Sequence, residues 1–259
     1  RCIGIIMNDE NKVRGVLLKM REETIDEIKD YQVVIGFSGF GNVGYLSLGH
    51  FIEKLDLVTI SMWGGSSWYY KNNLESIITA YKHEMSKTIF VLPRLPIHVS
   101  SISIRFWDQL VMDILNWNAR KYIVIGGLRE LKRDVVSKQW AEYALNQSWK
   151  KKFKEVHTFG DKLAMIGPLS SFLMKGTIMD IPVMGLLVYC NDEEDPEASL
   201  MAVNELNSIC KLKLKKTDEL FKFDYSFIPG GEISELYEDE ELKDNDDEEI
   251  PGYDLSDLT

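Results

Sequence analysis

The residues best suited to chemistry form a glycine-dense turn. Gly39, Gly41 and Gly44 have the spacing G-x-G-x-x-G, which lets a backbone approach the pyrophosphate of a dinucleotide when it joins a strand to a helix. The preceding run, 31–35, is short, apolar and β-branched, as is typical of a buried strand. A helical pattern follows, so an anion could bind at the first amides of that helix. Nucleotide binding is therefore one hypothesis.

Two features of the sequence count against nucleotide binding. The dinucleotide fingerprint expects an acid at the end of the second strand, where it binds the ribose, but that strand ends Thr-Ile-Ser-Met at 59–62. Asn42 also places a side chain inside the turn, where it can bond to its own loop. The alternative is structural: the glycines permit a positive-φ turn and close helix–strand packing. The residues open to either role are Gly36, Gly39, Gly41, Asn42 and Gly44.

Other catalytic patterns are incomplete. Ser38 lies in a sequence like a nucleophile elbow, but Phe40 stands where the second glycine is required. The four histidines are not placed as a Ser–His–acid triad requires. Four successive acids at 192–195 are interpreted as a solvated loop that caps the next helix. We therefore expect no catalytic residue, no metal site and no cofactor.

The negative charge is concentrated in the C-terminal segment. Residues 235–259 contain twelve acids and one lysine, a charge of −11 that equals the formal charge of the whole chain. Residues 1–234 hold 29 acidic and 29 basic side chains and are neutral. A neutral body with an acidic segment offers no surface that neutralises phosphates and no attraction to an anionic membrane. Nucleic acid and membranes are therefore excluded as expected partners.

The acidic segment also contains isolated apolar and aromatic residues. A segment of this composition cannot bury enough apolar surface to fold alone. Charge can instead steer it to a basic surface of a partner, where single side chains dock. The alternative is a solvated segment with no partner. The expected partner-binding residues are Leu236, Tyr237, Tyr253, Leu255 and Leu258.

Strand-like and helix-like runs alternate along the rest of the chain. Strand 57–61 follows the first helix, and a strand–helix–strand unit usually gives a parallel pair. Gly126 and Gly127 are interpreted as the turn after strand 122–125. We expect one α/β domain at 1–228, with a mostly parallel sheet covered by helices on both faces, and an acidic, flexible segment at 229–259. Further strands are expected at 76–81, 87–92 and 182–190, and helices at 102–117, 165–175 and 195–211.

The cysteines and the apolar runs bear on the compartment. Cys2, Cys190 and Cys210 form no C-x-x-C pair, so we expect buried structural thiols in a reducing environment. No apolar run approaches the roughly 18–20 residues of a membrane helix, and the start of the chain lacks the layout of a signal peptide. The expected location is cytoplasmic.

Several of these segments together resemble the proteasome assembly chaperone (PAC2) family, in particular its archaeal members. They are the glycine turn with its strand and helix at 34–44, the strand and glycines at 122–128, the helix entry at 160–173, the strand at 181–190 and the helix start at 195–198. The resemblance covers roughly residues 30–212. It implies a fold similar to the nucleoside phosphorylase/hydrolase-like α/β fold.

The resemblance also implies a function. Members of the family assist assembly of the 20S proteasome without ATP, and archaeal members form homo-oligomers. Some end in a hydrophobic–Tyr–any tripeptide that inserts between proteasome α subunits, whereas this sequence has that pattern only at 236–238. We expect a non-catalytic, homo-oligomeric protein that binds 20S subunits or their precursors. The alternative is a nucleotide-binding or phosphorylase-like enzyme that uses the Gly39–Gly44 loop.

Overall fold

The computed structural model describes residues 27–70, 73–94, 101–129, 140–153, 165, 167–191 and 194–220. Only the backbone is described at 64–70, 73–76 and 101–105. The chain divides into two units, Arg1–Phe223 and Asp224–Thr259, and every described residue belongs to the first.

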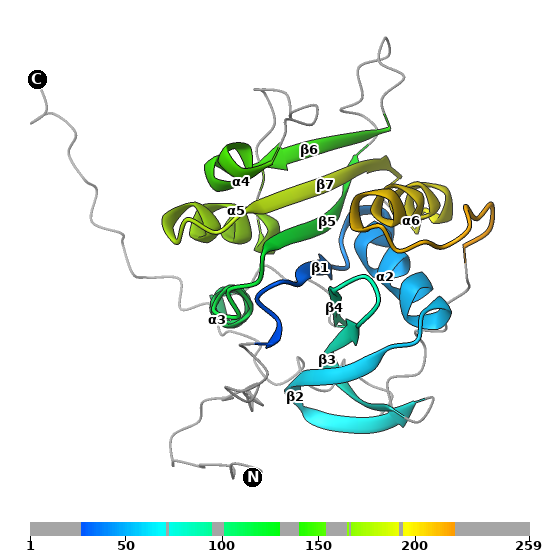
Figure 1. Ribbon diagram of the computed structural model, residues 1–259, viewed down its shortest axis with the longest axis horizontal. Helices are drawn as coiled ribbons and strands as arrows, with labels where there is room; N and C mark the ends of the chain where they lie inside the picture. Colours follow the sequence, from blue (N-terminus) through cyan, green and yellow to red (C-terminus); the bar gives the residue numbers. More distant parts are fainter. Residues whose placement is uncertain are drawn as a thin grey trace, which may run out of the picture. The chain divides into compact units, whose positions relative to one another are not determined.

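The described part is built on a seven-stranded sheet with the order β2-β3-β4-β1-β5-β7-β6 (Figure 1). The four inner strands β4, β1, β5 and β7 run parallel, whereas β3 and β6 pair antiparallel with β4 and β7, and β2 pairs antiparallel with β3. The strands are β1 (Gln32–Gly36), β2 (Val58–Tyr70), β3 (Asn73–His83), β4 (Thr88–Pro93), β5 (Lys121–Arg129), β6 (Ala141–Leu145) and β7 (Val183–Cys190).

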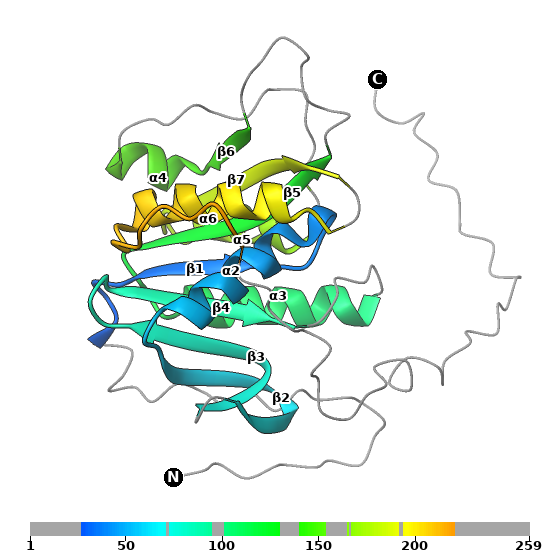
Figure 2. The same ribbon diagram turned by 90° about the vertical axis from the view of Figure 1, so that its right-hand side faces the viewer.

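Helices cover both faces of the sheet, as Figures 1 and 2 show. The helices α2 (Val43–Lys54) and α6 (Pro196–Cys210) pack together on one face, and α3 (Ser101–Leu115) and α5 (Pro168–Ile178) on the other. The short helix α4 (Gln147–Lys152) follows β6. This architecture confirms the expected α/β fold. None of the helices in the described segments is long and apolar enough to span a membrane.

The core consists of two layers, one on each side of the sheet, because successive strand residues point to opposite faces. Along β1, Val34 joins the layer beneath α2 and α6, whereas Val33 and Ile35 join the layer beneath α3 and α5. All three side chains are fully buried. Burial of one such side chain stabilises a fold by roughly 1.5–3 kcal/mol. Because both faces of the inner strands are covered, their sequences are nearly continuous apolar runs.

Two expectations about the sheet were wrong. The strand after α2 lies at the edge of the sheet as β2, separated from β1 by β3 and β4. Short connections make β2, β3 and β4 an antiparallel meander, and only β4 reaches β1. The second error concerns Gly126 and Gly127, which form no turn. Strand β5 runs through them to Arg129, in register with β7.

A cluster of charges fixes the β3–β4 turn against the residue that precedes β1. The Glu84 carboxylate accepts a hydrogen bond from the Tyr31 hydroxyl at 2.5 Å and ion pairs from Lys87 at 2.5 Å and Lys82 at 3.1 Å. These hydrogen bonds, of which the one from Lys87 has the largest effect, lower the pKa of Glu84 from 4.5 to about 2. The ammonium of Lys87 also lies 4.8 Å from the centre of the Tyr31 ring.

We expect this cluster to make stability depend on acid pH. The folded pKa of Glu84 is lower than its unfolded pKa, so its contribution is complete above pH 4.5 and is lost as the pH falls towards 2. Because the side chain is exposed, the contribution is below about 1 kcal/mol. In Glu84→Gln, the melting temperature, followed by circular dichroism, should fall less between these pH values than in the wild type. Glu219→Gln, on the exposed segment after α6, is the control, and equal slopes for all three proteins would contradict the assignment.

Candidate functional site

The glycine turn lies where the inner strands β1, β5 and β7 end. The 3-10 turn η1 (Phe40–Asn42) follows β1, and α2 begins directly after it. Asn42 is the N-cap of α2 with a left-handed backbone (φ 48°), and its side chain makes no capping hydrogen bond. The strands that follow β1 in the chain lie on both sides of it in the sheet, with β2, β3 and β4 on one side and β5 on the other. Ligands of open α/β sheets bind at such a switch point, so the glycine turn occupies the expected place for one.

Backbone fills the side of the turn that faces the sheet. A Cβ atom built on Gly36 would lie 2.2 Å from the carbonyl oxygen of Gly44, and one on Gly44 would lie 2.7 Å from the carbonyl oxygen of Ile125. A Cβ on Gly127 would lie 1.9 Å from the carbonyl oxygen of Phe40. Real Cβ atoms do not approach other atoms this closely. These three glycines therefore let β1, α2 and β5 pack directly against one another.

The far end of the turn is attached to the start of α6. Gly41 has a φ of +63°, and its Cα faces Cys190, whose Sγ would lie 2.8 Å from an added Cβ. The carbonyl oxygen of Gly41 accepts a hydrogen bond from the amide of Asp195 at 3.0 Å. The side chain of Asp195 caps α6, because its Oδ1 accepts from the amide of Ala198 and its Oδ2 from the amide of Asn191. Asp195 is thus a helix cap, as its sequence context predicts.

Gly39 differs from its neighbours. Its φ is −174°, and an added Cβ would meet nothing within 4 Å. Phe40 beside it is 44% exposed, and the guanidinium of Arg129 lies 4.5 Å from the centre of its ring. This pair was not predicted from the sequence, because nothing near Phe40 signals an arginine at the end of another strand. Exposed aromatic and arginine side chains are enriched at the centres of protein interfaces.

The arrangement does not reproduce a dinucleotide site. In such a site the strand that follows the first helix lies beside the first strand, and its last residue reaches the ribose. Here the strand after α2 is β2 at the sheet edge, and β4 takes the place beside β1. The close packing of Gly36, Gly44 and Gly127 supports the structural interpretation of the glycine turn.

Neither of the two histidines among the described residues belongs to the turn itself. His50 is buried inside α2, and burial lowers its pKa, which favours the neutral ring. His83 lies at the end of β3, where its Nδ1 is 2.7 Å from the hydroxyl of Ser86. Within the described segments, no group of three His, Cys, Asp or Glu side chains could hold a metal ion. His98 and His157 lie outside those segments.

The remaining sequence-based assignments fall into two groups. Cys190 and Cys210 are buried and belong to no disulfide, as expected, and burial raises the pKa of Cys210 to about 12. The other group lies outside the described residues and stays a prediction: Leu236, Tyr237, Tyr253, Leu255 and Leu258.

Comparison with known proteins gives one family and one fold. The model of the PAC2 family matches residues 33–222. No curated protein sequence matches the chain. Among solved structures, PbaA of Pyrococcus furiosus, described as an archaeal homologue of proteasome-assembly chaperone, is 17% identical with a TM-score of 0.60, over 78% of this chain and 87% of that one.

Two further structures have the same fold. A protein of unknown function from Thermoplasma acidophilum is 16% identical with a TM-score of 0.60, over 76% of this chain and 83% of its own. PbaB of Pyrococcus furiosus, described as an archaeal proteasome activator, is 16% identical with a TM-score of 0.57, over 78% of this chain and 91% of its own.

Proposed function

Since the chain belongs to the PAC2 family, we propose that it is a non-catalytic protein-binding protein that acts on the proteasome, either in its assembly or on the assembled particle. The observation that carries this proposal is the family match, which spans residues 33–222 and so includes almost every described residue. Structures of the same fold include one described as a homologue of a proteasome-assembly chaperone and one described as a proteasome activator.

The geometry of the glycine turn supports the non-catalytic part of the proposal. The turn is packed into the sheet by backbone contacts at Gly36, Gly44 and Gly127, and its one left-handed glycine, Gly41, is bonded to the start of α6. These contacts give the glycines a role in packing, which needs no ligand. They favour a binding protein over the alternative of a nucleotide-binding or phosphorylase-like enzyme.

The finer parts of the proposal concern partners and place of action. We propose 20S proteasome subunits or their precursors as partners, ATP-independent action, a homo-oligomeric state and a cytoplasmic location. The acidic segment 235–259 would be drawn by charge to a basic surface of the partner and would dock its apolar side chains there. Tyr237 and Tyr253 are the aromatic candidates among them.

Removal of residues 235–259 tests this function. The truncated chain should lose at least about tenfold of its capture of proteasome subunits, because several charge contacts and anchors are removed together. The measurement is affinity purification of tagged protein from its native host, followed by quantitative mass spectrometry.

The control is a full-length chain with Lys151→Gln, which changes one charge on α4. Circular dichroism of the truncated chain should match that of the full-length protein. Undiminished capture by a folded, truncated chain would refute the role of the segment, and absence of proteasome subunits from both captures would refute the proposed function itself.

A further inference from the structure

The segment after α6 folds back along that helix and leaves a groove beside it. We call residues 211–217 the strap. Two asparagines of α6 hold it through paired hydrogen bonds. Asn207 Nδ2 donates to the carbonyl oxygen of Leu214 at 2.8 Å while its Oδ1 accepts from the amide of Leu214 at 3.1 Å. Asn204 bonds the carbonyl oxygen and the amide of Thr217 in the same way, at 3.2 and 3.4 Å. The backbone of the strap is thus held against α6 by these asparagine side chains.

The strap turns its apolar side chains inward and its lysines outward. Leu212 is 5% exposed and belongs to the core beneath α6, and its amide bonds the carbonyl oxygen of Asn207. Lys211 and Lys213 on either side of it have left-handed backbones, with φ of 56° and 62°. Such conformations are unusual for lysine and are held here by the buried leucine and the asparagine bonds. The result is a row of exposed lysines, Lys211, Lys213 and Lys216, on a backbone that is held against α6.

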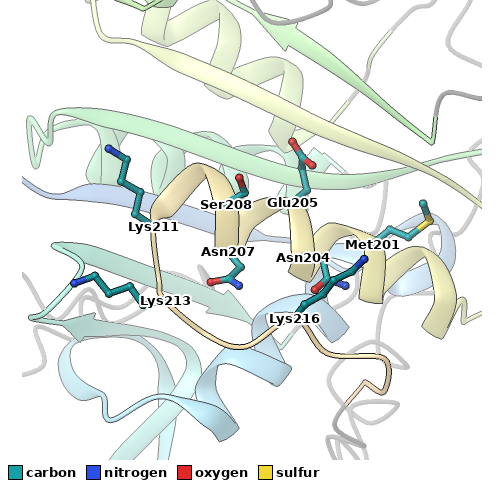
Figure 3. Close-up of a pocket in the computed structure, with 8 residues that line it drawn as sticks. All are labelled: Met201, Asn204, Glu205, Asn207, Ser208, Lys211, Lys213 and Lys216. Atoms are coloured by element: carbon teal, nitrogen blue, oxygen red, sulfur yellow. The ribbon is translucent and has the colours of Figure 1, made fainter.

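These groups line a groove with a volume of about 660 Å³ along α6 (Figure 3). Glu205 is its one carboxylate, and its Oε1 accepts a hydrogen bond from the hydroxyl of Tyr143 at 2.5 Å. The lining therefore carries three positive charges and one negative charge. Apart from Glu205 it comprises Met201, Asn204, Asn207, Ser208, Lys211, Lys213 and Lys216.

An open groove with a net positive lining, polar side chains and one methionine fits an extended acidic peptide that carries occasional apolar side chains. The chain itself contains such a peptide. Residues 235–259 have a charge of −11, whereas residues 1–234 are neutral. Oppositely charged surfaces steer association and fix which surfaces meet. The groove and the acidic segment are therefore complementary in charge and in composition.

We propose that the strap groove of one copy binds the acidic segment 235–259 of a second copy. Each copy carries one groove and one acidic segment, so a two-fold exchange fills both grooves at once. Closed two-fold pairing is the commonest arrangement of identical chains, and two contacts formed together hold more strongly than either does alone. Self-association would then use the same segment as partner capture, and a partner with a basic surface would compete with it.

A second basic cluster on the molecule provides a matched comparison. Lys150, Lys151 and Lys152 are exposed on α4 and carry the same three charges. Lys151 lies 3.7 Å from the carboxylate of Asp180, which partly neutralises the cluster. None of these three lysines lines the groove. General charge attraction would act at both clusters, whereas the proposed docking acts only at the strap.

The experiment measures self-association of the full-length chain by sedimentation at 50 mM and 300 mM salt. The groove variant carries Lys211→Gln, Lys213→Gln and Lys216→Gln. We expect the wild type to form a dimer that weakens as the salt concentration rises. The dimer dissociation constant of the groove variant should be at least about tenfold larger, because exposed charge pairs contribute modestly one by one but act together here. A fluorescent synthetic peptide of residues 235–259, followed by anisotropy, should bind the wild type and lose affinity to the same extent in the groove variant.

The α4 variant, with Lys150→Gln, Lys151→Gln and Lys152→Gln, should self-associate within about threefold of the wild type. All three changes in each variant replace exposed side chains, and thermal melts check that both proteins remain folded. A monomeric wild type, a groove variant that dimerises normally or an α4 variant that is weakened equally would each overturn the proposal. Proteasome capture is scored separately. A groove variant that no longer dimerises but captures proteasome subunits normally supports the docking, whereas a wild type that dimerises as expected but captures no proteasome subunits refutes the proposed function alone.

Discussion

Gly127→Ala is expected to reduce the free energy of unfolding by about 3 kcal/mol, at the upper end of the range for overpacked cores. A Cβ atom at this position would lie 1.9 Å from the carbonyl oxygen of Phe40 and 2.6 Å from the Sγ of Cys190. The first of these atoms is backbone and cannot rotate away. The glycine turn must therefore shift away from β5, and the contacts that join β1, α2 and β5 are lost together.

Gly39→Ala is the matched control, because the same methyl group meets nothing within 4 Å there and the backbone is extended. Its stability should stay within about 0.5 kcal/mol of the wild type, as is usual for surface substitutions. Urea titration followed by tryptophan fluorescence measures both variants. A Gly127→Ala protein within about 1 kcal/mol of the wild type would contradict the tight packing of the turn. If Gly127→Ala does not fold while Gly39→Ala does, the prediction is met in its strongest form.

Asn146→Ala should cost a similar amount, about 3 kcal/mol, through loss of hydrogen bonds at a buried site. The Oδ1 of Asn146 accepts from the amides of Trp149 at 2.9 Å and Val183 at 3.1 Å, and its Nδ2 donates to the carbonyl oxygen of Ile181 at 2.8 Å. Each buried group left without a partner costs about 1–3 kcal/mol. One side chain thus caps α4 and also joins it to the start of β7.

Two further variants make this prediction specific. Asn146→Asp keeps the acceptor for both amides but loses the donor to Ile181, so its stability should lie between those of the wild type and the alanine variant. Gln147→Ala changes the exposed neighbour and should have an effect within about 0.5 kcal/mol. Chemical denaturation ranks the four proteins. An aspartate variant no more stable than the alanine variant would show that the amide contacts are not the main contribution.

The sequence predicted the elements whose signals are local. The apolar run of β1, the strands β3 and β4, and the Asp195 cap of α6 each depend on residues within a few positions of one another. The alternation of these elements also predicted the α/β class. For the glycine turn, local spacing left two roles open, and only the contacts with β5 and α6 favour one of them.

The features that the sequence did not predict depend on distant residues. The place of β2 at the sheet edge is decided by the meander that carries β4 to β1. Strand β5 continues through Gly127 because it pairs there with β7, and the turn around Phe40, far earlier in the chain, occupies the space that a side chain at residue 127 would need. Asn146 looks unremarkable in sequence because two of its three partners belong to residues 181–183.

The position of β1 in the sheet also affects how quickly the protein can form. Gln32 pairs with Thr88 on one side and with Lys121 on the other, 56 and 89 residues later in the chain. Chains dominated by such distant pairings fold slowly. During synthesis at about 5–20 residues per second, β1 would wait roughly 4–18 s for its second neighbour. One side of its apolar run stays unpaired until then, and unpaired strand edges of this kind favour aggregation of a nascent chain.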